Sequence, residues 1–475
     1  MMMIMADNTK IVYAAGSAFV VGILSYYGIL CATILAVIVG VSVYKVRSLL
    51  EIPEVPKLEE KWWGPRDPKQ EDTSIEEFKI QVSDDTLNDL KDRLERTRQF
   101  TPSLEKTTQE YGINANLVKD IVQFWKNGYN WKEREIFLNQ YSHYKVSIQG
   151  LKIHYVHVKP TNTEGKKVLP LMLVHGWPGS IREFYGIIPL LTTPQDNRDF
   201  VFELIIPSLP GFGFSEATSK PGLGPTQMAV VLKNLMKRVG FNRFYIQGGD
   251  WGSVIVQSMA ILFPENVIGV HSNMPFSTTL RAKFLIMLGM IFPKLVVEDK
   301  YRSRMYPLKY NYEETGYQHI QGTKPDTVGF GLTDSPAGLA AYILEKFSTW
   351  THPDMNKREE AGLKDKFTYT DLLDNIMIYW INGNITSSMR IYKEYFSAVI
   401  PGFNKLPITV PSGVARYSQE IMHHPDFVLK DKWPNIVHSS DLDGGHFAAF
   451  ENPELLSKEI CEFVAKAEVC KKKLD

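Results

Sequence analysis

The stretch Gln247-Gly248-Gly249-Asp250-Trp251-Gly252-Ser253 decides the fold of this chain. An apolar run that favours a strand, residues 243–246, precedes it, and apolar residues at helical spacing follow it over 254–263. The stretch therefore predicts a sharp strand-to-helix turn, in which the flanking glycines leave room for the bend. Such a turn holds Asp250 out at the C-terminal edge of a sheet and predicts a nucleophile. An aspartate that only caps the following helix is the alternative interpretation.

Strands and helices alternate around this turn. Continuous apolar runs at 168–174 and 200–207 predict buried strands, and residues 226–239 predict the helix that leads to the strand before Asp250. A hairpin-like pair, 144–148 and 151–158, opens this part of the chain. The rhythm predicts an α/β fold with a mainly parallel sheet, whose C-terminal edge carries the active-site loops.

The segments outside this core have different patterns. Residues 74–78, 84–97 and 114–125 predict amphipathic helices, after a connector with repeated prolines and two adjacent tryptophans. Residues 277–402 are rich in aromatic side chains and methionine, lack buried-strand runs and predict a helical lid. Strand signals resume at 406–410 and 435–439, and 453–469 predict a closing helix.

The N-terminal segment 11–44 contains no charged side chain, and Lys10, Lys45 and Arg47 flank it. A membrane-spanning helix needs about 20 apolar residues, so this segment can cross a bilayer. It is too long for the apolar part of a cleaved signal peptide, which is the alternative, and no convincing small-residue cleavage site follows it. We expect a retained single-pass anchor in the lipid bilayer, with the more basic downstream flank and the catalytic part in the cytosol.

Composition excludes several classes of protein. The 53 Lys and Arg residues balance 53 Asp and Glu residues, so there is no overall basic field to attract nucleic acid. The three cysteines, Cys31, Cys461 and Cys470, give neither a disulfide framework nor metal-ligand spacing. We therefore expect no nucleic-acid partner and no metal site.

A carboxylate nucleophile needs a base that activates water in a second step, and the chain order should be nucleophile, acid, histidine. His446 follows the last predicted strand in Gly444-Gly445-His446-Phe447, although a surface-loop histidine is the alternative. Glu420 is the first candidate for the orienting acid, Asp426 the second, and Asp443 ranks lower. An ordinary solvated carboxylate is the alternative interpretation of Glu420.

Two backbone amides are candidates for an oxyanion hole. The Trp251 amide directly follows Asp250, and the Trp177 amide lies in the loop after an earlier predicted strand. Amides in these two positions would stabilise the oxyanion that forms when an ester on Asp250 is hydrolysed. The tryptophan rings themselves could also simply line an apolar pocket.

Several motifs together resemble the microsomal epoxide hydrolase family over essentially the whole chain. They are the Trp-Trp-Gly-Pro connector, His175-Gly176-Trp177-Pro178, Gly248-Gly249-Asp250-Trp251-Gly252-Ser253, residues 316–321 with 323–327, and Gly444-Gly445-His446-Phe447. The resemblance implies an α/β-hydrolase fold, an N-terminal module that wraps the lid, and residence on the endoplasmic reticulum. Lys472 and Lys473, fourth and third from the C-terminus, resemble a retrieval signal of that membrane, although a solvated basic helix end is the simpler interpretation.

The resemblance also assigns roles within the lid. By motif, Tyr317 and Tyr392 match two tyrosines that hold and protonate an epoxide oxygen, although lid packing is the alternative for each and Tyr395 could be mistaken for Tyr392. A glutamate as the orienting acid agrees with Glu420. No metal or organic cofactor is implied.

The predicted reaction has two steps. Asp250 attacks an epoxide carbon while the tyrosines protonate the departing oxygen, and water activated by His446 then hydrolyses the ester to give a vicinal diol. A haloalkane dehalogenase and a catalytically silent binding protein are the rival interpretations. The substrate is expected to be a lipophilic epoxide, either insect juvenile hormone or a xenobiotic.

The predicted domain boundaries follow these patterns. They are a short N-terminal flank (1–10), the anchor (11–44), a connector with the N-terminal module (45–143), the first part of the core (144–276), the lid (277–402) and the second part of the core (403–475).

Overall fold

The computed structural model describes residues 25–28, 33–34, 51–65, 70–304 and 308–472. The chain divides into two compact units, Met1–Glu54 and Val55–Asp475. Most of the predicted anchor, 11–44, lies outside the described residues, as does the C-terminal end of the lysine motif. Within the described ranges, no helix combines the length and the apolar character that crossing a membrane requires.

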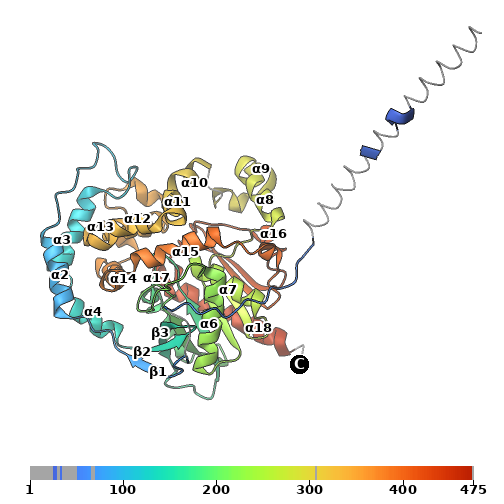
Figure 1. The fold of residues 1–475 in the computed structure, drawn as a ribbon, viewed down its shortest axis with the longest axis horizontal. Coiled ribbons are helices and arrows are strands. Elements are labelled where there is room, and N and C mark those ends of the chain that lie inside the picture. Colours follow the sequence, from blue (N-terminus) through green and yellow to red (C-terminus); the bar gives the residue numbers. More distant parts are fainter. Residues whose placement is uncertain (1–24, 29–32, 35–50, 66–69, 305–307, 473–475) are drawn as a thin grey trace, which may run out of the picture. The chain divides into compact units, whose positions relative to one another are not determined.

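Nine strands of the second unit form one sheet in the order β1-β2-β3-β5-β4-β6-β7-β8-β9 (Figure 1). The first pairings, from β1 to β5, are antiparallel, and all pairings from β5 to β9 are parallel. The strands are β1 (Ile75–Phe78), β2 (Ser142–Ile148), β3 (Leu151–Val158), β4 (Lys167–Val174), β5 (Phe200–Pro207), β6 (Phe244–Gly248), β7 (Val267–Ser272), β8 (Ser412–Tyr417) and β9 (Ile436–Leu442). The α/β-hydrolase fold is therefore confirmed.

The N-terminal edge of the sheet differs from the prediction. Residues 74–78 were expected in a helix, but Ile75–Phe78 form β1 and pair antiparallel with β2. Four residues are too few to form a stable helix alone, whereas the open edge of β2 supplies hydrogen-bond partners. The predicted hairpin itself is present, and its turn residues Gln149 and Gly150 have φ angles of 53° and 81°.

The late strands also differ from the prediction. The strand expected at 406–410 is instead β8, Ser412–Tyr417, and β7 was not predicted as a strand. Pro407 and Pro411 lack the amide that a central strand needs for its ladder. The sequence of β8 contains Arg416, which is buried because it pairs with Asp441 and Asp426.

Helices pack against the parallel part of the sheet and place its loops. The pair α6 (Pro225–Val239) and α7 (Asp250–Leu262) pack together, as do α5 (Ile188–Thr192) and α18 (Pro453–Lys472). β4 lies next to β6 in parallel, with Val174 in register with Gly248. The loops that follow these two strands therefore meet at one edge of the sheet.

The chain between β7 and β8 is helical, as expected for the lid. Its α-helices are α8 (Leu280–Ile291), α9 (Pro293–Val296), α10 (Leu308–Glu314), α11 (Gly316–Thr323), α12 (Pro325–Asp334), α13 (Pro336–Thr349), α14 (Tyr369–Asn382) and α15 (Ile385–Ser397). The earlier helices α2 (Asp84–Glu95) and α3 (Ala115–Asn127) pack on α13, and α4 (Trp131–Leu138) follows them along the same side of the molecule (Figure 1).

Asp374 of α14 joins the lid to the N-terminal helices and the core. Its side chain is fully buried and accepts hydrogen bonds from Arg134 of α4, from Arg182 and from the Tyr129 hydroxyl. A buried carboxylate is tolerated when cations and donors surround it, so these contacts fix the lid over the sheet.

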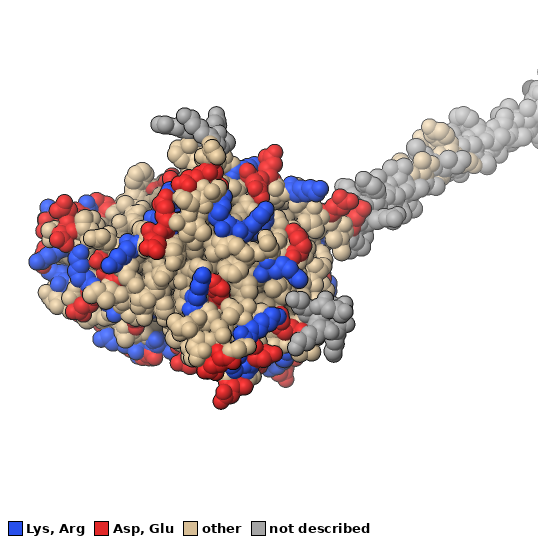
Figure 2. Space-filling model, turned by 90° about the horizontal axis from the view of Figure 1, so that it is seen from below, with Lys and Arg blue, Asp and Glu red and all other residues tan. Residues whose placement is uncertain are grey.

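Charges on the surface are mixed. Lys and Arg side chains alternate with Asp and Glu over the face drawn in Figure 2, and neither sign forms a continuous field there. This distribution agrees with the balanced composition and offers no basic track for nucleic acid on that face.

Candidate active site

Asp250 lies at the tight turn between β6 and α7, as the sequence predicts. Its φ angle is +47°, a left-handed conformation that costs a residue other than glycine about 1 to 3 kcal/mol. A Cβ at Gly248 would lie 2.5 Å from the Gly252 carbonyl carbon, and one at Gly252 would lie 2.0 Å from the Val174 oxygen. Small residues at both positions are therefore required for the turn to close.

The loop after β4 supplies an amide to this carboxylate. The Trp177 N–H donates to Asp250 Oδ1 at 2.7 Å. A Cβ at Gly176 would lie 2.1 Å from the same oxygen, so only glycine lets the loop approach so closely. Trp251 lies in the first turn of α7, where backbone amides lack partners within the helix, and its role as a second donor stays a prediction.

His446 connects Asp250 to a buried glutamate. Its Nδ1 lies 2.6 Å from Glu420 Oε1, and its Nε2 lies 3.5 Å from Asp250 Oδ2. Burial alone would lower the pKa of His446, but the carboxylates of Glu420 and Asp250 outweigh it and hold that pKa well above its ordinary value. The imidazole is therefore a cation while both carboxylates are charged.

The structure places the two other candidate acids elsewhere. Asp426 pairs with Arg416 and accepts from the Ser439 hydroxyl, and Asp443 accepts from the Ser418 hydroxyl at 2.6 Å. Among the three carboxylates that sequence reasoning weighed, Glu420 is the one that contacts His446.

The loop of His446 is fixed from two directions. Its own amide donates to the Trp350 carbonyl at 2.9 Å. The amides of Gly445 and Phe447 each donate to the carboxylate of Glu451 at 2.9 Å. These bonds hold the imidazole in place independently of Asp250.

The two predicted tyrosines meet above Asp250. The Tyr317 ring stacks on the Trp177 ring with centroids 5.7 Å apart, and the Tyr392 ring meets the Trp251 ring edge-on at 4.6 Å. The tyrosine rings lie 5.9 Å from each other. Burial raises the pKa of both phenols above the ordinary tyrosine value, and the nearby charge of Asp250 adds to this. Both hydroxyls therefore stay protonated and able to donate.

Comparison with known proteins now decides the family. A model described as epoxide hydrolase N terminus matches residues 75–184, and one described as alpha/beta hydrolase fold matches 170–406. Juvenile hormone epoxide hydrolase 2 of Ctenocephalides felis is 48% identical over 447 residues, which are 92% of this chain and 96% of that protein. The chain belongs to the epoxide hydrolase family. The matches favour epoxide hydrolysis over a dehalogenase or a silent binding protein.

Vertebrate and structural relatives agree with this. Epoxide hydrolase 1 of Oryctolagus cuniculus is 45% identical over 453 residues, which are 92% of this chain and 98% of that protein. The crystal structure of juvenile hormone epoxide hydrolase from the silkworm Bombyx mori superposes with a TM-score of 0.83 at 46% identity. That match covers 87% of this chain and 99% of that chain.

Part of the aromatic surroundings of this candidate site was not predicted from the sequence. Trp350 packs against both His446 and Tyr317, with ring centroids 5.0 and 5.1 Å away, and Tyr342 meets the Trp177 ring edge-on. The only signal for these residues was the general aromatic content of the lid. Tyr395, the residue that could be confused with Tyr392, contacts Trp251 at 5.2 Å, a longer distance than Tyr392.

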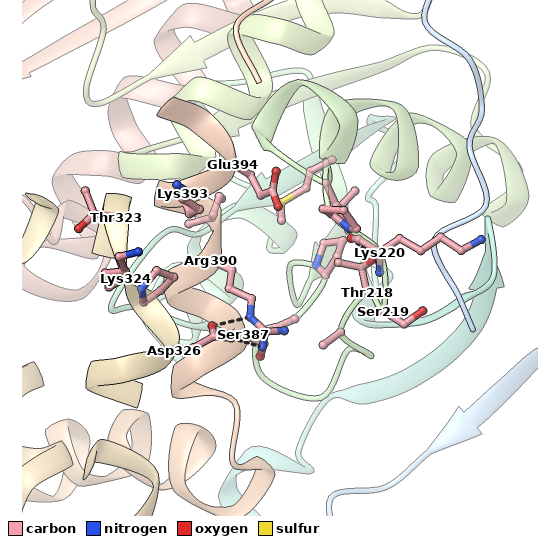
Figure 3. Close-up of a pocket in the computed structure, with 18 of the residues that line it drawn as sticks. Thr218, Ser219, Lys220, Thr323, Lys324, Asp326, Ser387, Arg390, Lys393 and Glu394 are labelled. Carbon is pink, nitrogen blue, oxygen red and sulfur yellow. Dashed lines mark hydrogen bonds and ion pairs between the residues drawn. The ribbon is translucent and has the colours of Figure 1, made fainter. Parts of the chain in front are cut away.

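A large pocket of this protein lies away from these residues. It encloses about 430 Å³ between the loop at 217–221, the junction of α11 with α12, and α15 (Figure 3). Charged side chains line it, including an ion pair between Arg390 and Asp326. None of the five candidate catalytic side chains lines it, so this pocket is separate from the candidate site.

One group of side chains has the spacing of metal ligands. His438, Glu459 and Glu462 bring ligand atoms within 4.8 Å of one another. His438 already contacts Glu459 at 2.8 Å through Nε2 and Lys466 at 2.8 Å through Nδ1. The ammonium group of Lys466 would repel a cation, so we interpret the group as a hydrogen-bonded ion cluster.

Proposed function

We propose that Asp250 opens epoxides by nucleophilic attack and that His446 hydrolyses the resulting ester. The observation that carries the proposal is the position of Asp250, between two protonated phenols and a carboxylate-bound imidazole. Oδ1 is held by the Trp177 amide, which leaves Oδ2 as the attacking oxygen. As the C–O bond of the epoxide breaks, Tyr317 or Tyr392 transfers its proton to the departing oxygen.

The second step restores the enzyme. The first step leaves an uncharged ester at Asp250 and a tyrosinate. Loss of the Asp250 charge lowers the pKa of His446, so the imidazolium can give its proton to the tyrosinate and become a neutral base. Water then gives one proton to His446 Nε2 as its oxygen bonds to Cγ of Asp250. The Trp177 amide, with the predicted Trp251 amide, stabilises the oxyanion. Collapse expels the diol, with the proton of the new carboxyl group passing to its oxygen, and regenerates the Asp250 carboxylate.

A single turnover in H₂¹⁸O tests this route. Hydrolysis at the Asp250 carbonyl places the label in the carboxylate, whereas direct attack of water on the epoxide places it in the diol. With enzyme in excess over styrene oxide, we expect label in the peptide that contains Asp250 and none in the first diol released. Label in that diol alone would contradict a covalent intermediate.

For the substrate, we propose juvenile hormone, an epoxide of low polarity. Relatives named juvenile hormone epoxide hydrolase match at 45–48% identity over most of the chain. The rabbit and pig proteins named epoxide hydrolase 1 match at 45%, which supports a xenobiotic epoxide as the second candidate. Comparison of kcat/KM for the hormone and for styrene oxide and cis-stilbene oxide separates them. A much higher value for the hormone supports a dedicated enzyme, and similar values support a generalist.

We also propose that the protein resides on the endoplasmic reticulum membrane through 11–44, with the catalytic part in the cytosol. The charge-free segment supports this, and so does the surface of α8, where four apolar side chains at helical spacing are more than half exposed. These side chains are Leu280, Phe284, Met287 and Ile291. Carbonate extraction and protease protection of microsomes test the proposal. Release by carbonate, or protection of the catalytic part, would argue against it.

A further inference from the structure

A small cavity lies beside Asp250, on a different side from the tyrosines. Its volume is about 20 Å³, and its lining includes Trp177, Asp250, His446 and Glu183. Among the described residues, neither Tyr317 nor Tyr392 belongs to the lining. A cavity of about 10–15 Å³ or more holds one water molecule if polar groups surround it. This cavity therefore has the size and the chemistry of a site for a single water next to the nucleophile.

Glu183 projects its carboxyl group toward this cavity from the short helix after the Trp177 loop. The carboxyl lies so close to Gly179 that a Cβ there would be 1.3 Å from Oε1. The Glu183 carboxyl group also lies near the Ser180 amide, and it interacts electrostatically with the charges of His446 and Asp250. Burial raises the pKa of Glu183 to about 8, so the group is mainly a neutral carboxylic acid at neutral pH.

A water that attacks Cγ of Asp250 must find an acceptor for each of its hydrogens, because its lone pair points at the carbon. His446 Nε2 accepts the first hydrogen. The lining also contains the polar side chains of Asn273 and His175. Asn273 already uses its oxygen to accept from Gln247 at 2.8 Å, and His175 uses Nε2 to accept from the Leu209 amide at 3.2 Å while its Nδ1 faces the Gly176 carbonyl. The carbonyl oxygen of the Glu183 carboxyl is the side-chain acceptor that remains for the second hydrogen.

We propose that Glu183 is a further catalytic residue, which holds the hydrolytic water in this cavity between itself, His446 and Asp250. The inference rests on the two-step hydrolysis proposed above and concerns only its second step. In that step the water loses one proton to His446 and forms the C–O bond, while Glu183 keeps its hydrogen bond to the remaining hydroxyl. A neutral acid suits this position because it adds no anion beside the developing oxyanion.

The alternative is that Glu183 only stabilises the loop that carries Trp177. That loop is braced separately by α14, where the Tyr379 hydroxyl donates to the Gly179 carbonyl at 2.7 Å and Asn375 donates to the Pro178 carbonyl at 2.8 Å. A structural role would disturb Trp177 and Asp250 together, and both chemical steps would then slow. A role in holding water slows hydrolysis alone.

Rapid-quench single turnovers of the full-length protein with styrene oxide separate these cases, since they give the rates of ester formation and of ester hydrolysis. Glu183→Leu keeps the size of the side chain but removes the acceptor. We expect it to form the ester at the wild-type rate and to hydrolyse it about 10²-fold more slowly, within the range for lost proton-transfer assistance. Glu183→Gln keeps a carbonyl acceptor and should hydrolyse the ester within about fivefold of the wild type.

Two further variants complete the test. Gly179→Ala should displace the Glu183 carboxyl group without removing it, and so slow ester hydrolysis selectively. This variant provides the test if Glu183→Leu does not fold. Tyr379→Phe removes a brace of the same loop and should leave the ratio of the two rates unchanged. Equal slowing of both steps in Glu183→Leu, or normal hydrolysis in it, would overturn the role of Glu183. An absence of any ester in the wild type would instead overturn the proposed function.

Discussion

The two sides of Asp250 are built differently. The lid side presents two phenols within an aromatic cluster, and burial raises the pKa of each so that it remains a proton donor. The core side presents an imidazole between two carboxylates, which hold its pKa above the ordinary value. One side is thus suited to protonate a leaving oxygen, and the other to accept a proton from water once the charge on Asp250 is lost.

In the proposed reaction, the two chemical steps use different faces of the Asp250 carboxylate. The epoxide needs an apolar surface with donors, whereas hydrolysis needs an acceptor chain that ends in Glu420. The structure separates these requirements by chain region: the lid supplies the tyrosines, and the loops after the strands supply the histidine and the acid. Variants on the two sides should therefore affect different steps.

Asp250→Ala should have the largest effect, because both faces act on this side chain. We expect no covalent ester by intact-protein mass spectrometry and a loss of turnover of at least about 10⁴-fold. Retention of the native fold is checked by circular dichroism. Diol formation near the wild-type rate would show that Asp250 takes part in neither step, and the two sides of the site could then not be assigned to two steps.

His446→Ala should distinguish the two chemical steps most clearly. The tyrosines remain, so the ester should still form, while hydrolysis should slow by about 10²–10⁴-fold because the base is missing. Mass spectrometry at increasing times after brief exposure to styrene oxide should show the adduct persisting in this variant and disappearing rapidly in the wild type. A variant that neither accumulates ester nor turns over would place His446 in the first step as well.

Replacement of the phenols should have the opposite effect to His446→Ala and slow ester formation rather than ester hydrolysis. Tyr317→Phe and Tyr392→Phe each leave one donor, so we expect moderate slowing of ester formation, and the double variant should lose about 10²–10⁴-fold. The hydrolysis rate of any ester that forms should change little. Rapid-quench rates of both steps provide the measurement, and a selective effect on hydrolysis would contradict the assignment of the tyrosines to the lid-side step.

The raised phenol pKa values also predict a pH profile. A phenol donates below its folded-state pKa and loses this ability above it, and an ordinary tyrosine has a pKa of about 10. Because burial raises the pKa of both phenols, the rate of ester formation should not fall between pH 9 and about 10.5. A decline with a midpoint near 10 would show that the phenols titrate as exposed tyrosines do.

The smallest effect concerns stability on the core side. The folded-state pKa of Glu183 is about 8 against an ordinary value of 4.5, so the folded protein binds the extra proton and this group makes stability fall as the pH rises between these values. Glu183→Gln has no such proton to lose. Its melting temperature relative to that of the wild type should therefore rise from pH 5 to pH 8 and stay constant above. A constant difference over the whole range would indicate an unperturbed carboxyl.

Sequence reasoning anticipated the parts of the site that a local motif specifies. The turn at Asp250 requires small neighbours, and the conformation of the backbone there leaves few residue types possible. It misplaced β1 and β8, whose hydrogen bonds come from distant strands. β8 in particular was not predicted because it contains the charged Arg416. This side chain can be buried because it forms ion pairs with Asp426 and Asp441.

By itself, the sequence determined the alternation of strands and helices, the sharp turn that carries the candidate nucleophile Asp250, and the order of the catalytic candidates, because these depend on near neighbours in the chain. Tertiary structure alone decided that Glu420 rather than Asp426 meets His446, since both lie in the segment between β8 and β9. It also placed Glu183 and Asp250 at the same small cavity. Distances between groups far apart in the chain depend on how the loops after different strands come together in space, and patterns among near neighbours in the sequence do not specify this.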